Sequence, residues 1–411
     1  MSASLQEGIY HGPGQRPGAF FDIVFLRVER GTTAGALAAL LGDLWSMYQG
    51  LKQGRVADLP GHPVPADNLT VLLSYGVKAF DLAGARRPAP ASLGPEFRFR
   101  SPRPGGGGPL LVNAGLHYAA DVALNPATEE LAVQFIADSA LAVHRAVVET
   151  WKVLRGHVDP QLGVPPLEIA AAFSGFQRND GRSWIDFHDG VSNLRSQDRE
   201  LVIGIKPENA PLDQDAWVVG GTHLAFVRLS VDLAVWRGLT PAQQELAVGR
   251  AKLTGSPLRS RDDDGNPLPD PRCPVAGTRE VVEPGNEAFR EPETSADEQV
   301  GRSHVQRANR HVPNIGSANS LRVFRQGYEF LESPPGGGFR VGLNFVSFQD
   351  SPERLTRMLT AKDWLGGTNF GGTPGDLPGM DRLLGVRAAG IYLVPPVTDG
   401  EDFPGQRILV G

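Results

Sequence analysis

The order of strand-like and helix-like stretches constrains this chain more than any other feature of its sequence. In the first 176 residues, apolar, β-rich runs alternate with two stretches of helical periodicity. The elements expected in chain order are a strand over 19–28, a helix over 32–51, strands over 69–76 and 131–137, a helix over 138–156 and a strand over 166–176. This succession of two strand–helix–strand units is typical of a ferredoxin-like α+β domain.

Local signals support both helices of this unit. Thr32 or Thr33 is expected to be the N-cap of the first helix, and Asp138 that of the second, which Gly156 ends. The apolar residues that recur at helical spacing in the first helix are Leu37, Leu40, Leu41, Leu44 and Met47.

The second half of the chain repeats the same order. Its expected elements are a strand or hairpin over 216–233, a helix over 240–252, strands over 321–330 and 339–349 and a helix over 351–364. Thr240 and Ser351 each precede a proline, which is a favourable helix start. The repeat rests on element order, because no direct sequence repeat is visible. We predict an α+β protein of two ferredoxin-like halves, each an antiparallel sheet with helices on one face, with domains over 1–165 and 166–411.

Composition excludes several classes of function. The formal net charge of −6 argues against nucleic-acid binding, which requires a basic surface. Cys273 is the only cysteine, so the chain has no internal disulfide and no cysteine-based metal cluster. No run reaches the ~18 apolar residues that a membrane helix needs, and no signal peptide or twin-arginine start is visible. We expect a cytoplasmic protein with neither a nucleic-acid nor a membrane partner.

A loop of unusual length precedes the first candidate ligand. Residues 253–302 connect two expected elements, and such long connections in compact domains are mostly functional or disordered. The loop leads into GRSHVQRANRH at 301–311, where His304 lies among Arg302, Arg307 and Arg310. An exposed basic run is one interpretation. A second is haem, because a metal in a macrocycle needs only one histidine, and its propionates require arginines. Zinc is disfavoured, because no further ligands occur at suitable spacing.

Two more stretches carry candidate chemistry. In SWIDFHDGVSNL at 183–194, Asp189 is either part of a polar turn or a carboxylate held among apolar side chains to move a proton. In LRVFRQGYEF at 321–330, strand alternation places Arg325 on one face with Leu321 and Val323, and Arg322 on the other. An arginine on an apolar face is costly unless it meets an anion, so Arg325 forms either a salt bridge or part of a ligand site.

These stretches resemble, in this order, the dye-decolourising peroxidases, a family of haem enzymes built from two ferredoxin-like halves. DFHDG at 186–190 is similar to the family's G-x-x-D-G segment, HVQRAN at 304–309 to its histidine run, and FRQGYEF at 324–330 to its arginine strand. AVGRAKLTGSPL at 247–258 and GLNFVSFQ at 342–349 match two further segments. The match runs in register from about residue 170 to 355. The N-terminal half matches only in the order of its elements and in the residues LQEGIY at 5–10.

The resemblance implies one haem b per chain and a role for each matched residue. His304 would be the proximal iron ligand, Asp189 the distal acid–base group and Arg325 the distal arginine. Leu343 and Phe345 would line the distal face of the haem. The weaker candidates for the haem propionates are Arg250, Arg307 and Arg310.

The resemblance also implies a peroxidase, an oxidoreductase that reduces hydrogen peroxide and oxidises aromatic one-electron donors such as bulky dyes and phenols. Such donors cannot enter a narrow haem cleft, so their electrons would pass through surface aromatic side chains. The candidates are Trp184, Tyr328 and Trp364. Asp350 or Glu353 would accept a hydrogen bond from the second ring nitrogen of His304. Paired domains of this kind often associate, so a homo-oligomer is also considered.

Asp186 departs from the family pattern, which has glycine at this position. Glycine would allow a close backbone approach, and a carboxylate so near Asp189 would favour the protonated form of Asp189. His188 is expected at the surface. The departure keeps two alternatives open: a haem-binding carrier, sensor or iron-release protein with weak turnover, and a scaffold that has lost haem.

Overall fold

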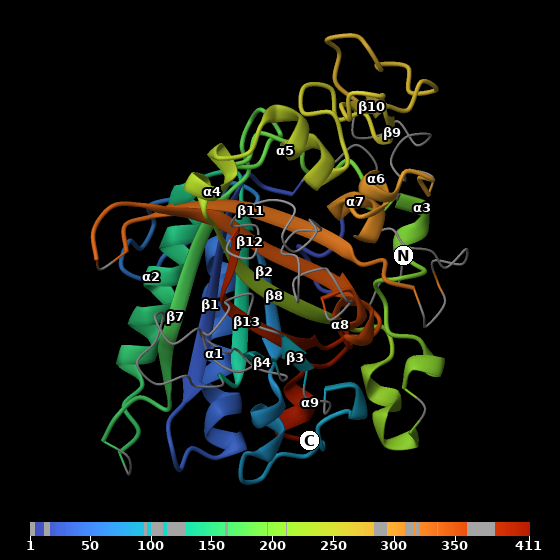
Figure 1. The fold of residues 1–411 in the computed structure, drawn as a ribbon. Helices are drawn as coiled ribbons and strands as arrows, with labels where there is room; N and C mark the ends of the chain where they lie inside the picture. The colour runs from blue at the N-terminus through green and yellow to red at the C-terminus, as the bar shows by residue number, and fades with distance from the viewer. Residues whose placement is uncertain are drawn as a thin grey trace.

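The computed structural model describes residues 5–11, 17–93, 97–99, 110–112, 129–160, 163–194, 196–210, 212–282, 294–308, 316, 320–334, 336–359 and 383–411. Eight strands form one closed sheet in which all neighbouring strands are antiparallel (Figure 1). Four come from the N-terminal half: β1 (Phe20–Val28), β2 (Thr70–Tyr75), β6 (Leu131–Ala137) and β7 (Leu167–Phe176). Four come from the C-terminal half: β8 (Thr222–Val231), β11 (Phe324–Glu332), β12 (Arg340–Gln349) and β13 (Leu384–Val394).

The strand order confirms the predicted duplication. If each half's strands are numbered in chain order, both halves have the order 4-1-3-2, which is β7-β1-β6-β2 in one half and β13-β8-β12-β11 in the other. This is the order of a ferredoxin-like sheet. The halves meet at two narrow joints, where β2 pairs with β13 at Tyr75–Leu393 and β7 pairs with β11 at Phe176–Glu329. Each half therefore contributes its second and fourth strands to the joints.

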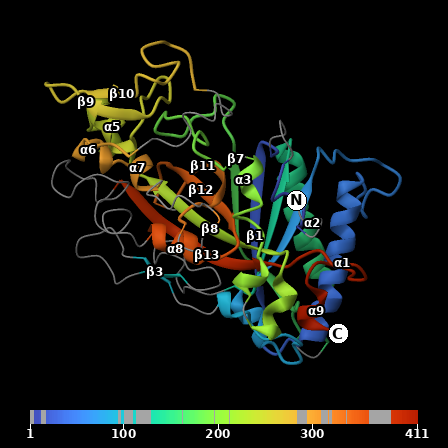
Figure 2. The ribbon, with the colours of Figure 1, turned by 90° about the vertical axis from the view of Figure 1, so that its right-hand side faces the viewer.

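Two long helices cover the outer face of the N-terminal sheet. They are α1 (Ala34–Lys52), which Thr33 caps, and α2 (Ala140–Gly156). The N-cap of α2 is Ser139 rather than the expected Asp138, because the Ser139 hydroxyl accepts from the Ala142 amide. In Figure 2, α1 and α2 lie on the opposite side of the strands from α5 and α7.

The C-terminal sheet is covered by much shorter helices. They are α4 (Leu233–Arg237), α5 (Pro241–Val248), α6 (Glu298–Gly301), α7 (His304–Ala308) and α8 (Glu353–Leu359). Two further short helices are α3 (Ser196–Arg199) and α9 (Gln406–Leu409). Each of these helices is shorter than α1 or α2 and so covers a smaller part of its sheet.

The interior of the closed sheet is an apolar core shared by both halves. Strand alternation points Phe21, Ile23 and Phe25 of β1 inward and leaves the residues between them under the helices. The Phe21 ring stacks on Tyr328 of β11, with the ring centroids 4.5 Å apart. The Phe173 ring of β7 stacks on Phe226 of β8 at 5.6 Å. Side chains of the two halves therefore interleave in one core.

Several sequence expectations need correction. The loop over 253–302 contains a hairpin, β9 (Leu258–Arg261) and β10 (Pro267–Pro269), and ends in α6. The stretch over 216–233 contains one strand, β8, and β13 was not expected. The helix expected over 240–252 ends at Val248, because Gly249 has a φ of +90° that stops it. The second part of the helix expected over 351–364 lies outside the described residues.

Two further observations concern the chain as a whole. The division into 1–165 and 166–411 stays a prediction, and β7, which follows the boundary, pairs with β1 over nine residue pairs.

A small two-stranded sheet joins β3 (Phe97–Phe99) to β4 (Leu110–Val112). In the described residues, no helix has the length and apolar character needed to cross a membrane.

Candidate functional site

A deep pocket opens on the outer face of the C-terminal sheet. The space inside the pocket, counted out to its mouth and including open solvent there, is about 1560 Å³. Its floor is formed by the outward-facing residues of β8, β11 and β12, and its walls by α5, α7, α8 and the loop before Asn193. The apolar lining residues are Trp184, Ile185, Phe187, Val191, Val227, Leu229, Val231, Val248, Val305, Ala308, Leu321, Val323, Leu343, Phe345, Met358, Leu383 and Leu384.

Six of the eight predicted site residues line this pocket: Asp189, Arg250, His304, Arg325, Leu343 and Phe345. They come from sequence positions up to 156 residues apart. Arg307 does not line the pocket, and its Nε donates to the carbonyl of Arg302. Arg310 lies outside the described residues.

The carboxylate of Asp189 lies between an arginine and a glycine. Its Oδ1 is 3.9 Å from Nη1 of Arg325 and accepts a 2.7 Å hydrogen bond from the Gly190 amide. Its Oδ2 lies over Gly327, where a Cβ would approach that oxygen to 2.9 Å. Two hydrogen bonds between Asn193 and the backbone of Arg325, at 2.7 and 3.1 Å, fix the loop to β11. Gly327 therefore provides the space in which this carboxylate lies.

His304 begins α7 at the wall of the pocket. Its ring is half-buried, and this burial is the main reason that the pKa is lowered to about 3, with smaller contributions from the charges of Arg325 and Arg250. The imidazole is consequently neutral at physiological pH. A neutral imidazole has a ring nitrogen lone pair that can bind a metal.

Arg250 is a buried cation at the pocket wall. Its Nη1 donates to the Gly255 carbonyl at 2.8 Å, and its Nη2 donates to the Ser192 hydroxyl at 2.5 Å. Burial, together with a smaller effect of the nearby Arg325 charge, lowers the pKa of Arg250 to about 10. Arg322 also lines the pocket, although strand alternation assigned it to the other face. The reason is that β11 begins only at Phe324, so alternation does not apply to Arg322.

Asp186 does not line the pocket. Its backbone has a φ of +66°, in the left-handed region that favours glycine. Its carboxylate is 60% exposed and 3.8 Å from Nζ of Lys252. The backbone at position 186 therefore has a conformation that glycine adopts readily. The Asp186 side chain does not reach the pocket.

His188 lines the pocket, so its expected surface position is wrong. The ring is half-buried, its Nε2 is enclosed, and burial is the main cause of its lowered pKa. It follows Phe187, which is buried against Trp236 with ring centroids 6.0 Å apart. Phe187 and His188 both line the pocket.

Glu329 is a pocket residue that the sequence did not indicate. Its side chain is on the outer face of β11, and the residue is only 6% exposed. Burial, with a further contribution from the Asp189 charge, raises the pKa of Glu329 to about 8. A single glutamate in a strand gives no sequence signal, because its environment is set by residues far along the chain.

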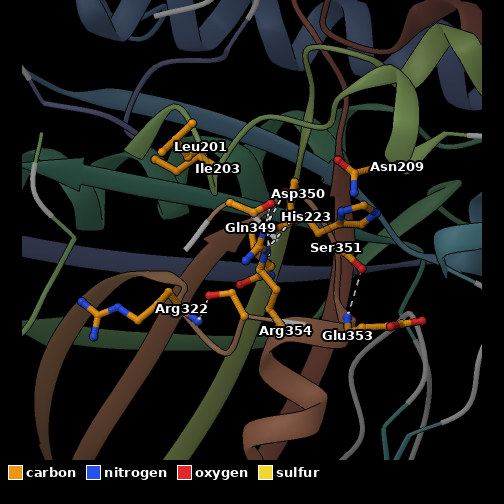
Figure 3. Close-up of polar contacts among 12 residues, drawn as sticks. Leu201, Ile203, Asn209, His223, Arg322, Gln349, Asp350, Ser351, Glu353 and Arg354 are labelled. Atoms are coloured by element: carbon orange, nitrogen blue, oxygen red, sulfur yellow. Dashed lines mark hydrogen bonds and ion pairs between the residues drawn. The ribbon is translucent and has the colours of Figure 1, made fainter. Parts of the chain in front are cut away.

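Asp350 and Glu353, the two residues considered as hydrogen-bond acceptors for the second ring nitrogen of His304, lie outside the pocket. Figure 3 shows Asp350 beside Arg354, whose Nε and Nη2 donate to both carboxylate oxygens at 2.6 and 2.9 Å. Both side chains are almost fully buried. Glu353 is exposed, and its amide donates to the Ser351 hydroxyl at 3.3 Å. Neither acid lines the pocket, so either one's role toward His304 stays a prediction.

The three aromatic candidates for electron entry differ in position. Trp184 lines the pocket, and its Nε1 donates to the Phe330 carbonyl at 2.9 Å. Tyr328 faces the interior core, on the opposite face of β11 from the pocket. Trp364 lies outside the described residues.

Comparison with known proteins gives a consistent result. Residues 180–399 match the model of a protein family described as "Dyp-type peroxidase, C-terminal". A deferrochelatase of Escherichia coli O157:H7 is 23% identical over 226 residues, which are 55% of this chain and 45% of that protein. A dye-decolorizing peroxidase of Thermobifida fusca is 28% identical over 229 residues, 54% of this chain and 44% of that protein. The matched region is thus about half the length of these curated relatives.

Solved structures support the fold over nearly the whole chain. The crystal structure of a DyP-type peroxidase from Cellulomonas bogoriensis covers 99% of this chain and 97% of its own, with a TM-score of 0.68 and 20% identity. The encapsulated DyP-type peroxidase from Mycobacterium smegmatis, solved by cryo-EM, covers 96% of each chain, with a TM-score of 0.62 and 18% identity. The predicted α+β fold of two ferredoxin-like halves is therefore confirmed.

Proposed function

Because the chain belongs to the Dyp-type peroxidase family, we propose that it is a haem peroxidase that reduces hydrogen peroxide and oxidises aromatic one-electron donors. The observation that carries the proposal is the convergence of Asp189, Arg325 and His304 on one large, mostly apolar pocket.

The pocket residues fit a haem group. His304 offers a neutral imidazole, the usual single protein ligand of haem iron. In the part of the chain that the structure describes, no group of three or more His, Cys, Asp or Glu side chains could hold a bare metal ion. A macrocycle that already binds its metal needs no such group. The apolar lining suits a large planar ring, and Arg250 supplies a cation for an acidic edge.

Each pocket residue would have a defined task. His304 would bind the iron from the α7 side, and Leu343 and Phe345 of β12 would pack against the opposite face of the ring. Arg250 would pair with a propionate, with Arg307 and Arg310 as weaker candidates. When bound, haem supplies the iron centre and conjugated ring that take up the oxidising equivalents of hydrogen peroxide.

Asp189 and Arg325 would perform the proton and charge chemistry. Oδ1 of Asp189 is occupied by the Gly190 amide and faces Arg325, so Oδ2 is the oxygen that we assign to proton transfer. Asp189 would accept a proton from one oxygen of hydrogen peroxide and return it to the other, which leaves as water. The Arg325 guanidinium would stabilise the negative charge that develops as the O–O bond breaks.

Electrons would enter through Trp184. Its indole lines the pocket and is half-buried, so one edge reaches solvent. The Arg178 guanidinium lies 5.3 Å above the indole ring, and Phe176 packs against its edge at 6.0 Å. Bulky dyes and phenols would give up electrons at this edge.

A second candidate function is haem binding with weak turnover, as a carrier, a sensor or an iron-release protein. The observation in its favour is the match to proteins named deferrochelatase. The two functions share His304 and differ in what they require of Asp189 and Arg325, because a carrier needs no acid–base group.

The test is haem binding and peroxide turnover of the wild type, His304→Ala, Asp189→Asn and a control, His62→Ala, which changes an exposed histidine. We expect His304→Ala to lose or shift the Soret band, and Asp189→Asn to keep it. Turnover of Asp189→Asn should fall roughly 10²–10⁴-fold, as for loss of a general acid–base group. A Soret band with no peroxide turnover in the wild type would favour the carrier. No Soret band would refute both functions.

A further inference from the structure

A second carboxyl group lies beside Asp189 in the pocket, and the proposed function does not use it. Arg325, Gly327 and Glu329 alternate along β11, so all three face the pocket side of the sheet. In a strand, such residues are spaced roughly 6.6 Å apart. Asp189 Oδ2 lies over the middle one, Gly327. The carboxylate of Asp189 thus has Arg325 on one side and Glu329 on the other.

The surroundings of Glu329 favour its neutral, protonated form. Its backbone pairs with Leu343 of β12 and Phe176 of β7, which place apolar side chains beside it. The charged groups that face it from the neighbouring loop and strand end are Asp189 and Arg178. Arg178 is already bound to Asp180, with donor–acceptor distances of 2.6 and 3.0 Å.

The two carboxyl groups differ strongly in exposure. The Asp189 side chain is 45% exposed and has the Gly190 amide and Arg325 beside it, so it can carry a negative charge. Glu329 is 6% exposed. Burial, with a smaller contribution from the Asp189 charge, raises the pKa of Glu329 to about 8. A hydrogen bond from the Trp184 backbone and the Arg178 charge act in the opposite direction. Of two close carboxyl groups, the more buried one keeps the proton.

We propose that Glu329 is a proton-donating partner of Asp189, and that the two carboxyl groups share one proton at neutral pH. The proposal rests on the proposed function in one respect, which is that electrons arrive from donors outside the pocket. The second water of a peroxidase cycle requires two protons as well as two electrons. A donor oxidised at Trp184 delivers its electron there, while its own proton stays in solvent.

The proton transfer that we propose is balanced. A proton leaves the Glu329 carboxyl and reaches Asp189 Oδ2, directly or through one water, so Glu329 becomes the anion and Asp189 the neutral acid. Asp189 gives that proton to the oxygen being reduced to water, and solvent then returns a proton to Glu329. Glu329 acts through Asp189 and is a positioning residue for the proton.

The test compares wild type, Glu329→Gln, Glu329→Asp and Asp186→Asn as haem-loaded proteins. The first readout is the infrared band of a protonated carboxylic acid. We expect a band at pH 7 that disappears above about pH 8, is absent in Glu329→Gln and is unchanged in Asp186→Asn, whose exposed carboxylate is in the same loop as Asp189. Labelling the wild type with ¹³C at its glutamate carboxyls should shift the band, which identifies the group without any variant.

The second readout is the pH profile of donor oxidation. Wild-type turnover should fall as pH rises through about 8, because Glu329 loses its proton in that range. Glu329→Gln should be slower at pH 7, by roughly 10²-fold, and lack the fall near pH 8. Glu329→Asp should recover part of the rate.

The outcomes separate this proposal from the proposed function. An infrared band that vanishes in Glu329→Gln supports the shared proton whether or not the chain turns over peroxide. Normal peroxide turnover without such a band, or with the same pH profile in Glu329→Gln as in wild type, overturns the role of Glu329 and leaves the peroxidase assignment intact.

Discussion

The backbone angle φ of Asp186 limits which residues can occupy this position of the motif. The left-handed φ of +66° is sterically costly for most side chains, and aspartate is one of the few that tolerate it. The side chain points to Lys252 rather than to the pocket. A glycine would fit the same backbone conformation, and the acid–base role that we propose stays with Asp189.

We predict that Asp186→Gly and Asp186→Ala differ in stability while both retain activity. Glycine adopts a positive φ without penalty, whereas alanine does not and lacks the local hydrogen bonding of aspartate. The free energy of unfolding should therefore be about 1 kcal/mol higher for Asp186→Gly than for Asp186→Ala. Urea unfolding measures this difference. A several-fold change in peroxide turnover in Asp186→Gly would show that the carboxylate does reach the pocket.

The predictability of the site also differs from residue to residue. Asp189, His304 and Arg325 were found because each lies in a local pattern that resembles a family motif, and the structure brings all three into one pocket. Glu329 and His188 were missed or misplaced. Their environments depend on contacts with residues distant in the chain, such as Asp189 for Glu329 and Gly255 for His188.

At the scale of elements, one glycine governs how α5 meets α7. Gly249 ends α5 with a φ of +90°, and a Cβ at this position would lie 2.3 Å from the Ser303 hydroxyl. Ser303 directly precedes His304, and Arg250 directly follows Gly249. The close approach of two helix ends therefore sets the positions of both side chains in the pocket.

We predict that Gly249→Ala weakens haem binding as well as stability. The new methyl group must displace Ser303, which moves the start of α7 and with it His304. We expect about 1–3 kcal/mol of destabilisation and a lower haem occupancy after purification. The matched control is Gly265→Ala, where φ is +82° but no heavy atom lies within 4 Å of the added Cβ. Equal loss of haem in both variants would assign the effect to backbone strain and contradict the proposed helix contact.

Elements could be predicted from sequence where their pattern was simple. The four N-terminal strands of the closed sheet were predicted to within about one residue, because their apolar runs end at polar or turn residues, whereas β3 and β4 were not predicted. β13 was missed, because both of its faces are buried and its sequence lacks alternation. The helices of the C-terminal half were harder, because a pocket rather than a continuous apolar surface lies beneath them.

At the scale of the whole molecule, the shared interior core connects the two halves more firmly than the two joints do. Each joint is a single residue pair, whereas aromatic side chains of β1 and β7 stack on those of β11 and β8. Neither half could bury its inner face alone. The two ferredoxin-like halves should therefore behave as one folding unit.

We predict one cooperative unfolding transition. Replacing Trp45 and Trp151 with phenylalanine leaves tryptophans only in the C-terminal half, so fluorescence then reports on that half while far-ultraviolet circular dichroism reports on the whole chain. The two probes should give the same urea midpoint, which is the test of two-state behaviour. Separate midpoints would mean that the halves unfold independently.

The alternation of side chains along β8, β11 and β12 has a consequence for evolution. On each of these strands, one set of residues builds the interior core and the interleaved set forms the floor of the pocket. A mutation in the second set can alter chemistry while the first continues to hold the fold. Descendants of such a chain could acquire new substrates by changing every other residue, and a lineage could keep its architecture long after its sequence has diverged.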